Sequence, residues 1–175
     1  MTMRFSQADG TPVYSKSSAE QVGRVLRFVI DARAHQIAAL HVSGRRRKAL
    51  LVDWANVVGF GPDAVVIDDG AHLRQASNDY EERIARGRLD LHGRRVLTDA
   101  GFDVGPLTDV EFDEATGHIE LVETGRARVR GAGLLTIGPY AVVVAHAAVD
   151  APDPVDPPDP VDPPDRVDPP DPAAP

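Results

Sequence analysis

The sequence predicts an all-β protein in which two small β-barrels follow one another, joined by a short helical linker and followed by a disordered C-terminal tail. Three observations predict this fold: an internal repeat, short apolar runs bounded by turn residues, and a repeating Asp/Pro segment at the C-terminal end. We expect the two domains at residues 1–70 and 89–149, the linker at 71–88 and the tail at 150–175.

The internal repeat is a pattern of Gly, Asp and Ile that recurs 82 positions further along the chain. Three pairs of residues carry it: Gly23 and Gly105, Asp31 and Asp113, Ile37 and Ile119. The Gly-Pro pairs that close the two copies, at Gly61 and Gly138, are only 77 positions apart, so the second copy lacks about five residues. Loops tolerate such a loss best, and we expect it in the hairpin of residues 45–48.

Within each copy the segments are short and rich in Val, Ile, Leu and Phe, and Gly, Pro, Asp or Asn bounds them. This composition predicts closely spaced strands, including residues 37–42, 49–52 and 64–67. Asp113–Gly117 is predicted to be a hairpin turn, with Gly117 at a positive φ. Closure into a small barrel protects the edges of such short strands. The pattern leaves the strand boundaries within residues 124–137 open.

A short helix is predicted between the copies, over residues 78–86. Ser77 or Asn78 is the candidate N-cap, acidic residues occupy the first turn, and Gly87 ends the helix. The helix is either a spacer or packs Tyr80 and Ile84 against the mouth of a barrel, and we favour packing.

The C-terminal tail holds most of the formal charge. Residues 150–175 contain eight Asp and one Arg, so the tail accounts for −7 of the net charge of −8. Apart from Ala and Pro, the only apolar residue of the tail is Val, so the tail cannot form a core. Pro blocks hydrogen-bond ladders and the like charges repel, so we expect disorder with extended polyproline II conformations. The rest of the chain is almost neutral, and its overall charge does not indicate a nucleic-acid partner.

The composition also indicates in which cellular compartment the protein is expected. The chain has no Cys, which fits a reducing environment. No apolar stretch is long enough to span a membrane, and residues 1–10 lack the apolar core of a signal peptide. We therefore expect a cytoplasmic protein without a membrane span.

One order of motifs occurs in both copies. In the first copy it runs through Val22-Gly23, Asp31, the segment 54–57 and the closing strand 65–67, and the second copy shows the same order with a shorter middle. By this order each copy resembles the PRC-barrel family. Members include the cytoplasmic part of the photosynthetic reaction centre H subunit, the bacterial ribosome maturation factor and many short prokaryotic proteins. The resemblance implies a small β-barrel that contacts proteins, sometimes RNA-bound ones, and implies no catalytic residue.

Few residues of the sequence are candidates for catalysis or metal binding. Asp109, Glu111 and Asp113 alternate with apolar residues, so their carboxylates share one strand face. Such oxygens suit a hard cation, but we favour a solvated face. The six His residues are scattered, with His35 and His118 in predicted turns, and the Ser residues lack a nucleophile motif. We predict no catalytic, cofactor-binding or metal-binding residue and no enzymatic activity.

One dense basic cluster stands out at a predicted hairpin tip. It consists of Arg45, Arg46, Arg47 and Lys48. Such a cluster suits phosphate contacts and is a candidate anion- or RNA-binding site. Single-stranded RNA recognition usually adds exposed aromatic rings, whereas the nearby Trp54 is predicted to lie in the core. We favour a solvated loop.

The favoured function is therefore a non-enzymatic protein-interaction or scaffolding module with an unidentified protein partner, and self-association through barrel surfaces is compatible with it. The alternative is an RNA- or ribosome-associated factor resembling the ribosome maturation factor. A metal-dependent enzyme is a further and weaker alternative.

Overall fold

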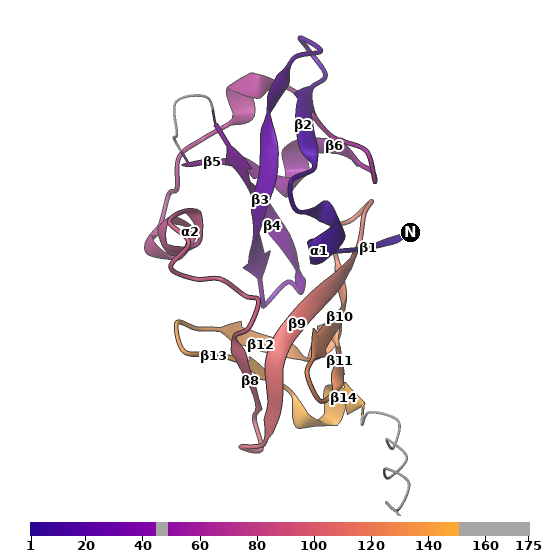
Figure 1. The fold of residues 1–175 in the computed structure, drawn as a ribbon, viewed down its shortest axis with the longest axis vertical. Helices are drawn as coiled ribbons and strands as arrows, with labels where there is room; N and C mark the ends of the chain where they lie inside the picture. Colours follow the sequence, from indigo (N-terminus) through magenta and orange to yellow (C-terminus); the bar gives the residue numbers. More distant parts are fainter. Residues whose placement is uncertain (45–48, 151–175) are drawn as a thin grey trace, which may run out of the picture.

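Two β-sheets with a short helix between them form the fold, as the sequence predicted (Figure 1). The computed structural model describes residues 1–44 and 49–150, and each sheet forms one domain. The basic cluster Arg45–Lys48 and residues 151–175, which make up nearly all of the predicted tail, lie outside the described residues.

The first sheet has the strand order β5-β4-β3-β2-β7-β6. Its strands are β2 (Pro12–Ser15), β3 (Gln21–Asp31), β4 (Gln36–Ser43), β5 (Ala49–Asp53), β6 (Val57–Phe60) and β7 (Val65–Ile67). β2 and β7 pair in parallel, whereas the other neighbours are antiparallel. The predicted strands at 37–42, 49–52 and 64–67 correspond to β4, β5 and β7.

The second sheet has the strand order β12-β13-β8-β9-β10-β11-β14, to which one further strand, β1, is added along β9. Its strands are β8 (Arg95–Thr98), β9 (Asp103–Asp113), β10 (Ile119–Thr124), β11 (Arg128–Arg130), β12 (Leu134–Ile137), β13 (Ala141–Val144) and β14 (Val149–Asp150). From β12 to β11 this order mirrors the first sheet, including a parallel pair between β8 and β13. The chain therefore repeats one arrangement of six strands.

The stretch that the sequence left open, residues 124–137, contains β11, a 3₁₀ turn (Gly131–Gly133) and β12. The first domain has the same succession in β5, a 3₁₀ turn (Trp54–Asn56) and β6. β10 and β11 are each two residues shorter than β4 and β5. The second domain is therefore shorter in this hairpin, as predicted.

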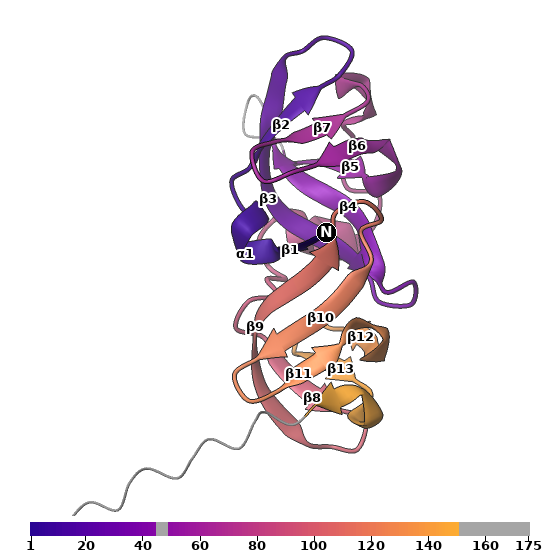
Figure 2. The ribbon, with the colours of Figure 1, turned by 90° about the vertical axis from the view of Figure 1, so that its right-hand side faces the viewer.

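The N-terminal segment crosses from the first domain to the second. β1 (Thr2–Arg4) pairs antiparallel with β9, and α1 (Phe5–Ala8) follows it at the junction of the two sheets (Figure 2). The carboxylates of β9 hold this segment, because Arg4 Nη2 lies 2.6 Å from Glu111 Oε1 and the Ser6 amide donates to Asp109. The predicted carboxylate face is thus a contact surface for the chain's own N-terminal segment.

Helix α2 (Asp79–Ala85) lies between the sheets in sequence and packs on the first one (Figure 1). Asn78 is its N-cap and accepts a hydrogen bond from the Glu81 amide, and Gly87 follows its end at φ +68°. Ile84 is buried with Val29, on the sheet face opposite the main core. Packing is therefore confirmed, although the helix covers the outer face of the sheet rather than its mouth.

A cluster of aromatic rings joins the two domains. Phe112, on β9, is completely buried and contacts rings of the first domain, with centroid distances between 5.4 and 6.0 Å. These rings are Phe5, Phe28, Trp54 and Phe60. Trp54 packs against the core but remains partly exposed. One hydrophobic core therefore runs through both domains.

Candidate functional site

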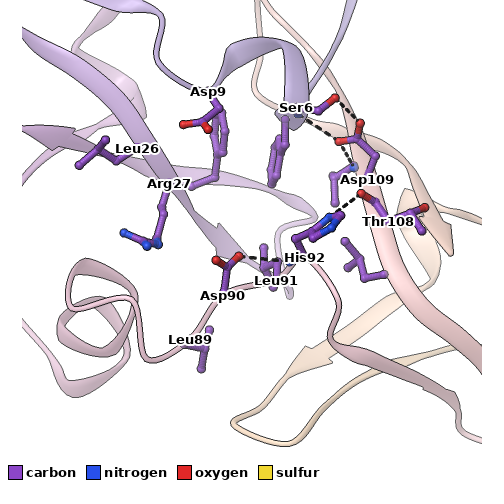
Figure 3. Close-up of a pocket in the computed structure, with 14 residues that line it drawn as sticks. Ser6, Asp9, Leu26, Arg27, Leu89, Asp90, Leu91, His92, Thr108 and Asp109 are labelled. Atoms are coloured by element: carbon purple, nitrogen blue, oxygen red, sulfur yellow. Dashed lines mark hydrogen bonds between the residues drawn. The ribbon is translucent and has the colours of Figure 1, made fainter. Parts of the chain in front are cut away.

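A groove of about 530 Å³ lies between the two domains (Figure 3). α1 and β3 line it from the first domain, and the segment 89–92 and β9 line it from the second. Its apolar lining includes Phe5, Phe28 and Leu107, together with Leu26, whose exposure of 41% is high for a Leu. A groove of this size, shared by two domains, is a common place for a binding site.

Equivalent positions of the two copies face each other in this groove. Several lining residues form pairs across the repeat: Leu26 with Thr108, Arg27 with Asp109, Phe28 with Val110, and Asp9 with His92. Asp9 and His92 each precede a Gly, Gly10 or Gly93, that lies two residues before β2 or β8. Equivalent positions of the two domains therefore line the same groove, but they differ in charge.

Three carboxylates line the groove, and their hydrogen bonds differ. Asp109 accepts from the Ser6 hydroxyl and from the amides of Ser6 and Val110. Among the described residues, the Asp90 side chain accepts only from the His92 amide, at 3.2 Å. Asp9 has no side-chain hydrogen bond to any residue that the structure describes. Asp9 and Asp90 are also exposed, so both remain available to a ligand.

Arg27 is the cationic residue of the described lining. Its guanidinium lies against Gly87, where an added Cβ would be only 3.0 Å from Nη2. Its Nε is buried and has no hydrogen-bond partner among residues 1–44 and 49–150. Gly87 thus leaves room for the Arg27 head group beside the end of α2.

His41 pairs with Arg27 across β3 and β4 and is 2% exposed. Neither ring nitrogen has a hydrogen-bond partner in the described part of the chain. Burial lowers the pKa of His41, and the positive charge of Arg27 lowers it further. His41 is therefore held in its neutral form beneath the groove-lining strand.

Ser6, His92 and Asp109 all lie in the groove, but they do not form a catalytic triad. A nucleophilic Ser donates its proton to a His that a carboxylate orients. Here Ser6 donates directly to Asp109, and His92 Nδ1 donates to the carbonyl of Thr108 at 2.9 Å. Within residues 1–44 and 49–150, no three His, Asp or Glu side chains form a group that could hold a metal ion.

Few of the singled-out residues that the structure describes line this groove. Arg45, Arg46, Arg47 and Lys48 lie outside the described residues, so the anion- and RNA-binding hypothesis remains a prediction. Of the predicted carboxylate face, only Asp109 lines the groove. Sequence reasoning missed Asp9, Leu26 and Asp90. The available signal was the repeat itself, because equivalent positions of two similar modules meet where the modules pack as a two-fold pair.

None of the helices that the structure describes is both long enough and apolar enough to cross a membrane. The sequence matches no curated protein. Residues 1–74, which contain the whole first sheet, match the family model of the PRC-barrel domain. The chain therefore contains a PRC-barrel domain in residues 1–74, followed by a second β-sheet domain with the same strand order.

Proposed function

We propose that the protein is a non-enzymatic protein-interaction module that acts in the cytoplasm, built from a PRC-barrel domain and a diverged second copy of it. The mirrored strand order and the equivalent residues at the groove support a duplicated origin. A diverged copy retains the fold while its surface changes, so a matching strand order is compatible with the absence of a second family match.

The observation that carries this proposal is the groove between the domains. It combines an exposed apolar residue, Leu26, with two carboxylates that have few contacts of their own, Asp9 and Asp90. Its Ser and His side chains are bonded to other groups and lack the connectivity for nucleophilic attack. Such a surface suits recognition of another chain better than chemistry.

The experiment is site-specific photo-crosslinking in cells. Leu26 is replaced by benzoylphenylalanine in the full-length chain, and Val58, which is 54% exposed and lies outside the groove, serves as the matched control position. We expect a defined protein adduct at position 26 and none at position 58. No adduct at position 26, or the same adducts at both positions, would contradict the proposal.

A catalytic role is tested separately with Ser6→Ala. The variant removes the groove hydroxyl that donates to Asp109. We expect neither the wild-type protein nor Ser6→Ala to show hydrolytic activity. A hydrolytic activity of the wild-type protein that Ser6→Ala abolishes would overturn the non-enzymatic assignment.

A further inference from the structure

We propose that the interdomain groove binds an extended peptide segment in which a Lys or Arg is flanked by apolar residues. This inference rests on the proposed function and specifies the chemistry of the partner. The argument has three parts: the charges that face the groove, the apolar surface beside them, and the size of the space.

The charge of the groove favours a cation. Asp9 and Asp90 lie on opposite sides of it, from the first domain and from the segment before β8 (Figure 3). Asp109 adds a third negative charge even though Ser6 occupies its oxygens. Arg27 offsets one of these charges, and its guanidinium is directed at Gly87. The described lining therefore keeps an excess of negative charge that a basic side chain can neutralise.

The apolar surface favours aliphatic or aromatic neighbours of that basic residue. Leu26 is 41% exposed, and Phe5 stacks on the buried Phe28 with a centroid distance of 3.8 Å. The methylene stem of a Lys or Arg also packs well on such a surface while its head group reaches a carboxylate. An apolar residue on either side would cover Leu26 and Phe5 and exclude water from them.

The space suits a few side chains rather than a folded domain. About 530 Å³ lies within the range of pockets that hold small molecules or short peptide segments. The same charges disfavour nucleic acid and acidic segments, because their anionic groups would face Asp9 and Asp90. A basic and apolar peptide is therefore the occupant that the groove favours.

The test selects peptides from a random display library on the full-length protein and measures their affinities for variants. Asp9→Asn combined with Asp90→Asn removes both available charges, and the side-chain carbonyl introduced by Asp90→Asn can still accept from the His92 amide. Asp63→Asn combined with Asp68→Asn makes the same change of net charge at exposed positions outside the groove. We expect selected peptides rich in Lys or Arg beside apolar residues.

We expect binding of these peptides to weaken about fivefold or more in the groove variant and to stay unchanged in the control. Added salt should weaken wild-type binding more than binding to the groove variant. Peptides that cross-link at position 26 but lack a basic residue, or that ignore both Asn substitutions, would overturn this inference and leave the proposed function standing. Failure of every peptide and every cellular protein to cross-link at position 26 would overturn both.

Discussion

Gln36 and His118 form an isolated antiparallel bridge between the two domains, at equivalent positions of the repeat. The amides of Ile37 and Ile119, which follow them, each donate to a carbonyl in the opposite turn, at 2.8 Å in both cases. The same hydrogen bond is thus made in both directions. Such reciprocity is a property of two-fold contacts between identical subunits, so the two domains pack as two copies of one module would.

The turn at Gly117 provides the first test of this contact. Gly117 has φ +73°, and an added Cβ would lie 2.6 Å from the Trp54 ring. Gly93 has a similar φ of +75° with nothing within 4 Å. We expect Gly93→Ala to lower the free energy of unfolding by about 1 kcal/mol through backbone strain, and Gly117→Ala to lower it by about 1–3 kcal/mol more because the ring must move.

Urea denaturation measures both variants. Adding Trp54→Ala to each Gly variant completes the comparison, because removal of the ring should reduce the cost of Gly117→Ala and leave that of Gly93→Ala unchanged. Equal costs for the two Gly substitutions would show that Trp54 does not pack on this turn.

Because the His41 side chain is buried, we expect the protein to lose stability in mild acid. Its folded-state pKa is lowered by burial and by Arg27, so between that pKa and the unfolded value of about 6.5 the unfolded chain binds more protons. The titration of His41 therefore leaves the free energy of unfolding unchanged above about pH 6.5 and lowers it as the pH drops below that value. His41→Leu removes this dependence and the two ring nitrogens that lack a partner among the described residues, so we expect a stabilisation of about 1 kcal/mol at pH 5 relative to wild type.

The measurement is the free energy of unfolding of wild type and His41→Leu at pH 8, 6 and 5. The difference between the two proteins isolates His41 from other titrating groups. Parallel pH profiles would contradict the prediction.

For Glu81 we expect a second loss of stability, at lower pH than the loss caused by His41. The side-chain hydrogen bonds of Arg74 lower the pKa of Glu81 to about 2, against burial, which raises it. Because the folded pKa lies below the unfolded value, the contribution of Glu81 is fully present above about pH 5 and is lost as the pH falls toward 2. Glu81→Gln should destabilise the protein by about 2 kcal/mol at pH 7 and less at pH 3.

Glu82→Gln is the matched control on the same helix. Glu82 is exposed, and among the described residues its side chain pairs only with Arg86, four residues along the chain. We therefore expect a change below about 0.5 kcal/mol. A similar small effect for Glu81→Gln would show that the hydrogen bonds from Arg74 to Glu81 contribute little to stability.

The repeat and the strand periodicity were sufficient to predict the two β-sheet domains, the hairpin turn at Gly117 and the helix that begins after Asn78. They were sufficient because each depends on local chemistry: turn residues, a cap and short apolar runs. The crossing of β1 to β9 was not predicted, because Thr2–Arg4 is too short to identify a partner. The groove was missed for a different reason: Asp9 and Asp90 line one space only because the two domains pack together, and the sequence does not show which faces pack.

The shared core predicts that the two domains unfold together. Phe112 is completely buried between rings of the first domain although it belongs to β9 of the second. We expect Phe112→Ala to lower the free energy of unfolding by about 3–5 kcal/mol. Phe102→Ala is the control, because Phe102 is 60% exposed and its loss should cost about 0.5 kcal/mol or less.

Trp54 is the chain's single Trp and lies in the first domain at its contact with Phe112. Its fluorescence therefore reports on that domain and on the contact, while circular dichroism reports on both sheets. In wild type we expect the two signals to change in one coincident transition. Phe112→Ala should shift both signals together, although the substitution lies outside the domain that holds Trp54. Residues 1–74 and 89–150, produced separately, should be unstable or should dimerise, because each then exposes its half of the aromatic cluster. Two resolved transitions, with only the circular dichroism transition shifted by Phe112→Ala, would show that the domains fold independently and that the groove between them is not a fixed surface.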